Sequence, residues 1–181
     1  MSYINLNNDL PGIVGLMHYR PETAKPLNEL AEILLRGPSS LTSAEREMIA
    51  SHVSHRNECH FCHSCHGAAA AHHLDGDLSL LGDIKNGFIK TELSEKMKAL
   101  LHIAGKVQIL GNRVTKEDVE SAKAEGASDL EIHDTVLISA AFCMYNRYVD
   151  GLGTWAPEED EAYDETGHML AHEGYLNSIP Q

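Results

Sequence analysis

Apolar residues recur at helical spacing along almost the whole chain, and this periodicity is what most limits its fold. Between residues 94 and 110 they form one stripe, which consists of Met97, Leu100, Leu101, Ala104, Val107 and Leu110. Residues 129–150 form the most apolar segment, so we expect them to be buried on nearly every side. No segment alternates like a β-strand. We therefore predict an all-α fold, a single-domain bundle of about seven to eight helices.

Capping signals and helix-breaking residues set the predicted boundaries. Thr42 and Glu45 form a capping box ahead of one helix, and Ser128 and Glu131 form a second. The predicted helices span residues 21–35, 43–54, 59–73, 77–86, 94–110, 115–126 and 129–150, followed by an amphipathic helix within 158–175. We expect residues 1–20 to form an N-terminal arm, 21–155 the helical domain, and 156–181 a C-terminal helix and tail that packs on this domain or on a neighbouring subunit.

Charge and cysteine content limit the partners and the compartment. The 181 residues include 14 Lys and Arg against 27 Asp and Glu, a net charge of -13, which argues against nucleic acid and anionic membranes as partners. No stretch reaches the roughly 18 apolar residues of a membrane span, and residues 1–9 have neither the basic nor the apolar region of a signal peptide. We expect a cytoplasmic protein whose four cysteines are reactive or buried.

A C-x-x-C-x-x-x-H motif, formed by Cys59, Cys62 and His66, runs into an alanine-rich segment that favours a helix. At about 100° per residue, Cys62 lies roughly 60° from Cys59 around the helix and His66 about 20° from it, so the three share one face. The two cysteines are then close enough to alternate between dithiol and disulfide. Because a helix N-terminus stabilises an anion, it also lowers a thiol pKa there.

Glu47 belongs to the preceding predicted helix. If the two helices form an antiparallel hairpin with its turn near residues 55–58, Glu47 and His66 lie level with each other. The carboxylate then orients or charges the imidazole, and the imidazole takes a proton from a thiol. We therefore expect a central helical hairpin that carries the candidate catalytic residues Glu47, Cys59, Cys62 and His66.

The cysteine-rich segment also fits other chemistries. Residues 59–63 spell C-x-x-C-H, the pattern of covalent haem attachment, although this attachment is made on exported chains. Zinc on Cys59, Cys62, His66 and His63 is chemically feasible, but closed zinc sites usually combine ligand pairs from separate elements. Inert buried cysteines are a further alternative. We expect His63 to face solvent.

The spacing Glu47-x11-Cys59-x-x-Cys62-x-x-x-His66 resembles the alkylhydroperoxidase D-like branch of the carboxymuconolactone decarboxylase superfamily. Residues 41–50, 57–67 and 145–151 are similar to its peroxidase-related subgroup, and the resemblance covers roughly residues 20–155. It implies that Cys62 attacks a hydroperoxide, that Cys59 resolves the sulfenic acid as a disulfide, and that His66 with Glu47 moves the proton. It also implies an external thiol or disulfide reductant protein, no bound cofactor, and a homo-oligomer, whether dimer, trimer or hexamer.

One residue departs from this pattern. The family's best-studied type has a second histidine directly before the second cysteine, where this chain has Phe61. The proton relay would then be one member shorter, and we expect Phe61 to be a core aromatic beneath the site. A decarboxylase-type member of the same superfamily is an alternative, but that branch generally lacks the cysteine pair.

Overall fold

The computed structural model describes residues 2–74 and 93–178, and over these ranges the chain is helical, without a strand. The α-helices are α1 (Gly12–Tyr19), α2 (Pro21–Arg36), α3 (Ser43–Arg56), α4 (His60–His72), α6 (Glu95–Ile109), α7 (Lys116–Ala124), α8 (Asp129–Gly151) and α9 (Asp164–His172). Short 3-10 helices follow at Gly111–Arg113, Asp160–Tyr163 and Leu176–Ser178. The predicted all-α fold is confirmed. The helix expected at 77–86 lies outside the described residues.

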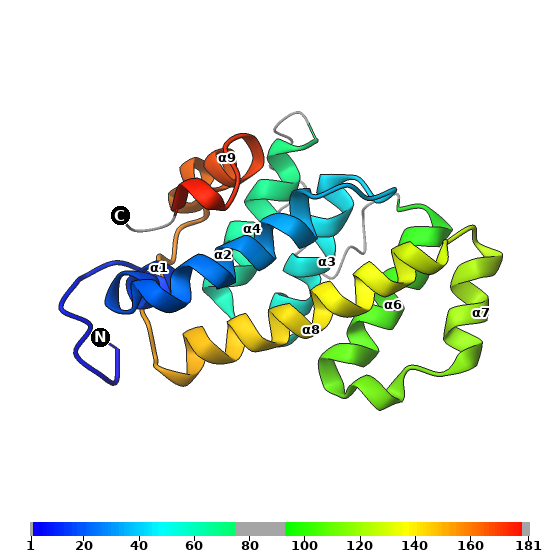
Figure 1. Ribbon diagram of the computed structural model, residues 1–181, viewed down its shortest axis with the longest axis horizontal. Helices are drawn as coiled ribbons and strands as arrows, with labels where there is room; N and C mark the ends of the chain where they lie inside the picture. The colour runs from blue at the N-terminus through cyan, green and yellow to red at the C-terminus, as the bar shows by residue number, and fades with distance from the viewer. Residues whose placement is uncertain (1, 75–92, 179–181) are drawn as a thin grey trace.

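Helices α3 and α4 form the central hairpin (Figure 1). The predicted capping box begins α3, because the Thr42 hydroxyl accepts from the Glu45 N–H while the Glu45 carboxylate accepts from the Thr42 N–H. Glu58 adopts a left-handed backbone, with φ of 60°, in the turn. Cys59 follows as the N-cap of α4. The chain therefore reverses directly before the first cysteine.

Helix α8, with 23 residues, is the longest of the described helices and passes along α3 and α6 (Figure 1). Ser128 and Glu131 form the second predicted capping box at its start. Its inward side chains, such as Ile138 and Phe142, are buried, but Met144 is 45% exposed, so not every side is covered within one chain. Among the described helices, none combines the length and the hydropathy needed to cross a bilayer.

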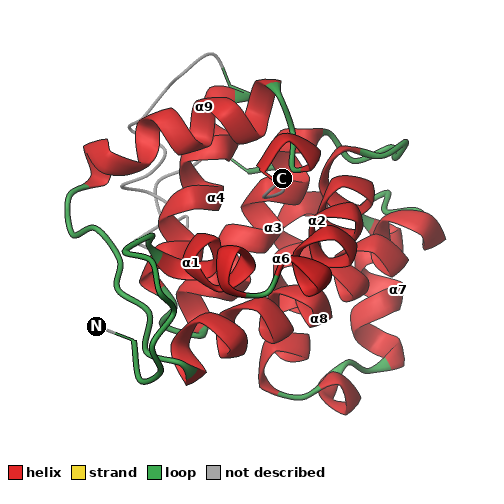
Figure 2. Cartoon of the chain, turned by 60° about the vertical axis from the view of Figure 1, so that its left-hand side comes forward, coloured by secondary structure: helices red, strands yellow, loops and turns green. Residues whose placement is uncertain are grey.

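Two further helices cover the hairpin. Helix α1 lies within the segment expected to be an N-terminal arm, and it packs on α2 and α8. Helix α9 packs along α4 of the same chain (Figure 2). The close approach of these two helices depends on Gly167, because a Cβ at this position would lie 2.5 Å from the Cβ of Ala68. Helix α9, in the C-terminal segment, therefore covers one side of the hairpin along α4.

Replacing Gly167 with alanine is expected to push α9 away from α4. Overpacking of this kind costs about 1 to 3 kcal/mol of unfolding free energy, which chemical denaturation monitored by circular dichroism would measure. Gly151→Ala is the matched control, because a Cβ there meets nothing within 4 Å. Equal stability of the two variants would contradict this account of the contact between α4 and α9.

Candidate active site

Cys59 and Cys62 lie at the start of α4, and both are buried free thiols. The two thiols are hydrogen bonded to each other. This hydrogen bond to Cys62, together with burial and the negative charge that Cys62 can carry, raises the pKa of Cys59 far above its usual range. Cys59 therefore keeps its proton at neutral pH, in contrast to the lowered thiol pKa expected at a helix N-terminus, and its side chain is also hydrogen bonded to the carboxyl group of Asp150.

His66 lies one turn further along α4, and its Nδ1 is 2.8 Å from Oε2 of Glu47 on α3. Glu47 is fully buried, and the imidazole is 12% exposed. The edge of the ring packs against Phe142 of α8, with the ring centroids 4.5 Å apart. Because the carboxylate accepts the Nδ1 proton, Nε2 is the nitrogen left to exchange a proton with a reacting group.

Tyr175 completes this hydrogen-bonded group, although no motif or spacing in the sequence points to it. Its hydroxyl donates to Oε1 of Glu47 over 2.6 Å and lies 3.3 Å from Nδ1 of His66. Burial, followed by the charge of Glu47, raises the pKa of this phenol well above its usual value, so the hydroxyl stays protonated. The backbone N–H of Tyr175 donates to Glu32 of α2 over 2.8 Å, which fixes the position of the residue.

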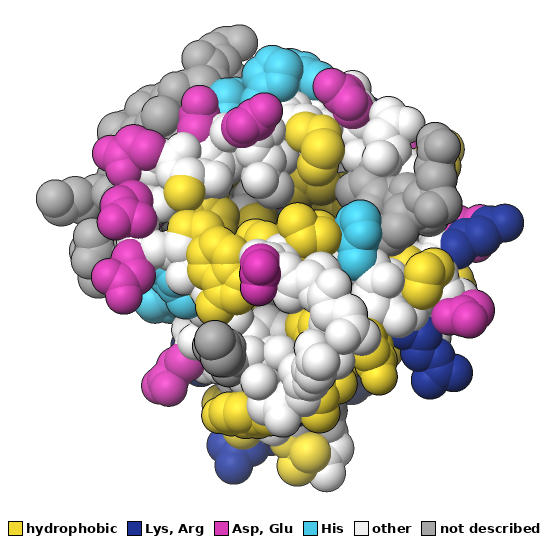
Figure 3. All heavy atoms as spheres, turned by 90° about the vertical axis from the view of Figure 1, so that its left-hand side faces the viewer, with side chains coloured by type: hydrophobic (Ala, Val, Ile, Leu, Met, Phe, Trp, Pro, Cys, Tyr) yellow, Lys and Arg dark blue, Asp and Glu magenta, His cyan; other side chains and the backbone are white. Residues whose placement is uncertain are grey.

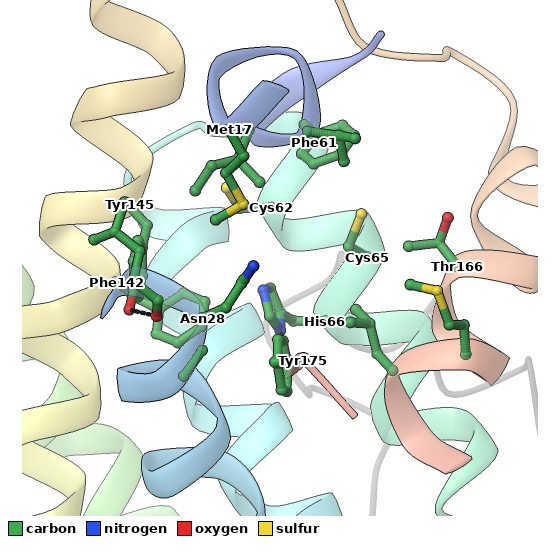
Figure 4. A pocket seen from close by; sticks show the side chains of 16 residues that line it. Met17, Asn28, Phe61, Cys62, Cys65, His66, Phe142, Tyr145, Thr166 and Tyr175 are labelled. Atoms are coloured by element: carbon green, nitrogen blue, oxygen red, sulfur yellow. Dashed lines mark hydrogen bonds between the residues drawn. The ribbon is translucent and has the colours of Figure 1, made fainter. Parts of the chain in front are cut away.

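A cavity of about 90 Å³ lies in front of Cys62 and His66 (Figure 4). Helices α1, α2, α4, α8 and α9 and Tyr175 contribute its lining. Its outer walls are partly exposed side chains of α1 and α9, namely Ile13, Val14, Thr166 and Met169. Figure 3 shows that hydrophobic side chains surround a hollow on this face of the molecule, with acidic side chains around them. The candidate site is therefore a small, largely apolar cavity.

Phe61 is buried in the core, as expected, but it also lines this cavity. Its ring occupies the place where a side chain at Gly12 would stand, since a Cβ there would lie 2.3 Å from the ring. The ring of Tyr163 packs against it at 6.0 Å between centroids. Phe61 thus supplies a wall of the cavity and joins α4 to α1.

The expectation that His63 faces solvent is wrong. Its side chain is buried, and Nδ1 is 3.0 Å from the hydroxyl of Ser51 on α3. A helical wheel for α4 alone does not include α3, which covers this face. Among the described residues, no three His, Cys, Asp or Glu side chains are gathered to hold a metal ion.

Replacing Tyr175 with phenylalanine removes a hydrogen bond to a buried carboxylate. We expect this change to lower the unfolding free energy by about 1 to 3 kcal/mol, because Glu47 loses a donor that water cannot replace. Denaturant titration would measure the loss. Tyr3→Phe, at a residue that is 79% exposed, serves as control, and an equal effect of both changes would show that the Tyr175 hydroxyl contributes nothing.

Alkylation should distinguish the thiols. At neutral pH we expect iodoacetamide to modify Cys62 before Cys59 and Cys65, because Cys62 lines the cavity whereas the pKa values of the other two are raised. Peptide mass spectrometry over time would give the order of modification, with urea-unfolded protein as the reference in which all four cysteines react. Faster modification of Cys59 than of Cys62 would contradict the assignment.

Comparisons with known proteins found one family model and several similar solved structures. Residues 21–74 match the model of the carboxymuconolactone decarboxylase family. A peroxidase-related protein from Silicibacter sp. TM1040 is similar in structure, with a TM-score of 0.76 and 26% identity over 85% of this chain and 78% of the other.

A second similar structure is an alkylhydroperoxidase AhpD core protein, also peroxidase-related, from Ralstonia eutropha JMP134. Its TM-score is 0.76, with 24% identity over 88% of this chain and 82% of the other, and it supports the fold. No curated protein matches. The resemblance expected from the motif is therefore confirmed: the chain is similar to the carboxymuconolactone decarboxylase family over residues 21–74 and to a peroxidase-related structure over most of its length.

Proposed function

We propose that this protein is a thiol peroxidase that reduces a hydroperoxide through a Cys59 and Cys62 dithiol/disulfide cycle. The observation that carries the proposal is that Cys62 and His66 line the same cavity while His66 is hydrogen bonded to the buried Glu47. A thiol, a base and a group that orients the base are what nucleophilic catalysis requires. The peroxidase-related protein from Silicibacter supports this choice among the activities of the superfamily.

In the first step His66 accepts the proton of Cys62, and the thiolate attacks the terminal oxygen of the hydroperoxide. The S–O bond forms as the O–O bond breaks, so the sulfur is oxidised by two electrons to a sulfenic acid. The other oxygen leaves as an alkoxide and takes the proton back from His66, which gives an alcohol. Glu47 holds the imidazole in the required orientation.

In the second step the thiol of Cys59 attacks the sulfur of the sulfenic acid. A disulfide forms and water leaves, and a dithiol protein must then reduce this disulfide by thiol exchange. The interaction of Cys59 with Cys62 supports this step, because the attacking and receiving sulfur atoms are already neighbours. No bound cofactor takes part in either step.

The cavity favours an uncharged organic hydroperoxide. Its described lining is mostly aliphatic and aromatic, and it includes no Lys, Arg, Asp or Glu side chain. An anionic substrate would find no counter-charge there, and the chain carries a net charge of -13. A small apolar body, in contrast, gains from leaving water.

The cytoplasmic location and the homo-oligomeric state remain part of the proposal. The apolar side chains of Leu137 and Met144 on α8, which are 40% and 45% exposed, give a single chain reason to self-associate.

Cysteine variants test the cycle. Cys62→Ser should abolish hydroperoxide consumption, because the attacking sulfur is lost, whereas Cys59→Ser should leave a sulfenic acid on Cys62 that dimedone labels. Peroxide consumption with a dithiol reductant and mass spectrometry would measure both outcomes. Cys143→Ser is the control and should keep the wild-type rate. Normal turnover by Cys59→Ser, with a reductant unable to replace a resolving cysteine, would overturn the division of labour.

A further inference from the structure

Asn28 on α2 has a buried amide without a partner. The residue is 3% exposed, and its Nδ2 is buried and makes no hydrogen bond within the described part of the chain. A buried donor without an acceptor lowers the stability of the folded state. Such groups are rare in folded proteins, and each one calls for a physical explanation.

The amide of Asn28 belongs to the cavity of the candidate site. Asn28 lines this cavity together with Cys62 and His66. Figure 4 shows its amide nitrogen directed toward the space between these two side chains. The donor therefore points to the place where a molecule that reacts with Cys62 must lie.

Neighbouring polar groups of the cavity have partners of their own. Nδ1 of His66 pairs with Glu47, and the hydroxyl of Tyr175 donates to the same carboxylate. The hydroxyl of Tyr145 donates to the carbonyl oxygen of Leu27 over 2.9 Å. The Asn28 amide is thus a donor whose natural acceptor is an oxygen atom of a molecule inside the cavity.

The cavity also limits the rest of that molecule. A volume of about 90 Å³ is smaller than the roughly 150 Å³ of a cavity that holds a benzene molecule, which suits a compact body of a few heavy atoms. The apolar side chains around it, such as Met17 and Phe142, would contact a short alkyl group. One acceptor oxygen and one small apolar group describe a short-chain alkyl hydroperoxide.

We propose that the side-chain amide of Asn28 donates a hydrogen bond to the leaving oxygen of a small, uncharged alkyl hydroperoxide held beside Cys62, an inference that rests on the peroxidase function proposed above. When Cys62 attacks the terminal oxygen, the O–O bond breaks and negative charge develops on the oxygen bound to carbon. A fixed donor at that atom stabilises the transition state more than the bound substrate. His66 then delivers its proton to the same oxygen.

The hydrogen bond to substrate explains why the Asn28 amide is left unpaired in the free protein, although this lowers the stability of the fold. In the free protein the donor lacks a partner, which lowers stability, but it needs no rearrangement when substrate binds. A leucine of similar size at this position would remove the unsatisfied donor. It should therefore preserve or raise thermal stability while it impairs the reaction, a combination that a purely structural role of Asn28 does not produce.

Kinetics of the Asn28→Leu variant test the proposal. With tert-butyl hydroperoxide and a dithiol reductant, we expect kcat/KM to fall roughly 10- to 100-fold, the effect of losing one hydrogen bond to a developing charge. The melting temperature should not fall. Leu35→Met, a volume-conserving change in the same helix outside the cavity lining, should stay within about twofold of wild type. Equal kcat/KM for Asn28→Leu and wild type would overturn the inference.

A binding measurement separates this inference from the peroxidase function itself. The Cys62→Ser protein is titrated with tert-butyl alcohol, the product of the reaction, and the side-chain N–H signals of Asn28 are followed by NMR, assigned through Asn28→Asp. Saturable shifts of these signals support the hydrogen bond, and unchanged signals overturn it. If wild-type protein fails to consume peroxide, the proposed function fails, and this titration alone decides whether Asn28 binds the oxygen.

Discussion

The buried carboxylate of Glu47 is the constraint on which the rest of the site depends. A carboxyl group without exposed surface is stable only when hydrogen-bond partners replace the water that it loses. Here two donors do so: His66 from the other arm of the hairpin and Tyr175 from the C-terminal segment. Each oxygen of Glu47 therefore ties a different part of the chain to α3. The orientation of the imidazole follows from this arrangement.

The outer helices decide what kind of molecule reaches the thiols. Helix α2 joins the C-terminal segment and α9 to the rest of the molecule. Its Glu32 accepts a hydrogen bond from the backbone N–H of Tyr175, and its Arg36 guanidinium donates to the carbonyl oxygens at the end of α9. The same helix carries Asn28 into the cavity. Apolar side chains around the cavity lower the local dielectric constant, which strengthens each of the few polar contacts inside it. A hydrogen bond from the unpaired amide of Asn28 is therefore stronger in this cavity than it would be at the surface.

Local chemistry explains why so much of the fold was predictable. The capping boxes at Thr42 and Ser128 act within four residues, so the sequence alone predicts where α3 and α8 begin. The pairing of Glu47 with His66 depends on one short turn, and residues at equal distance from a turn meet across a hairpin. In contrast, Tyr175 reaches Glu47 across 128 positions of sequence, and no spacing rule covers such a contact. The burial of His63 also depends on a second helix, α3, and a helical wheel of α4 alone does not include it.

By itself the sequence determined the all-helical class and the hairpin of α3 and α4. It also determined that this hairpin carries the candidate residues Glu47, Cys59, Cys62 and His66. These features depend on helical periodicity, capping and the geometry of one turn, which are properties of neighbouring residues. Only the tertiary structure decided that Tyr175 supplies the second donor to Glu47, that Phe61 and the helices α1 and α9 enclose a cavity, and that Asn28 points into it. Those features depend on how distant segments pack, and packing is decided by the shape of the whole folded chain.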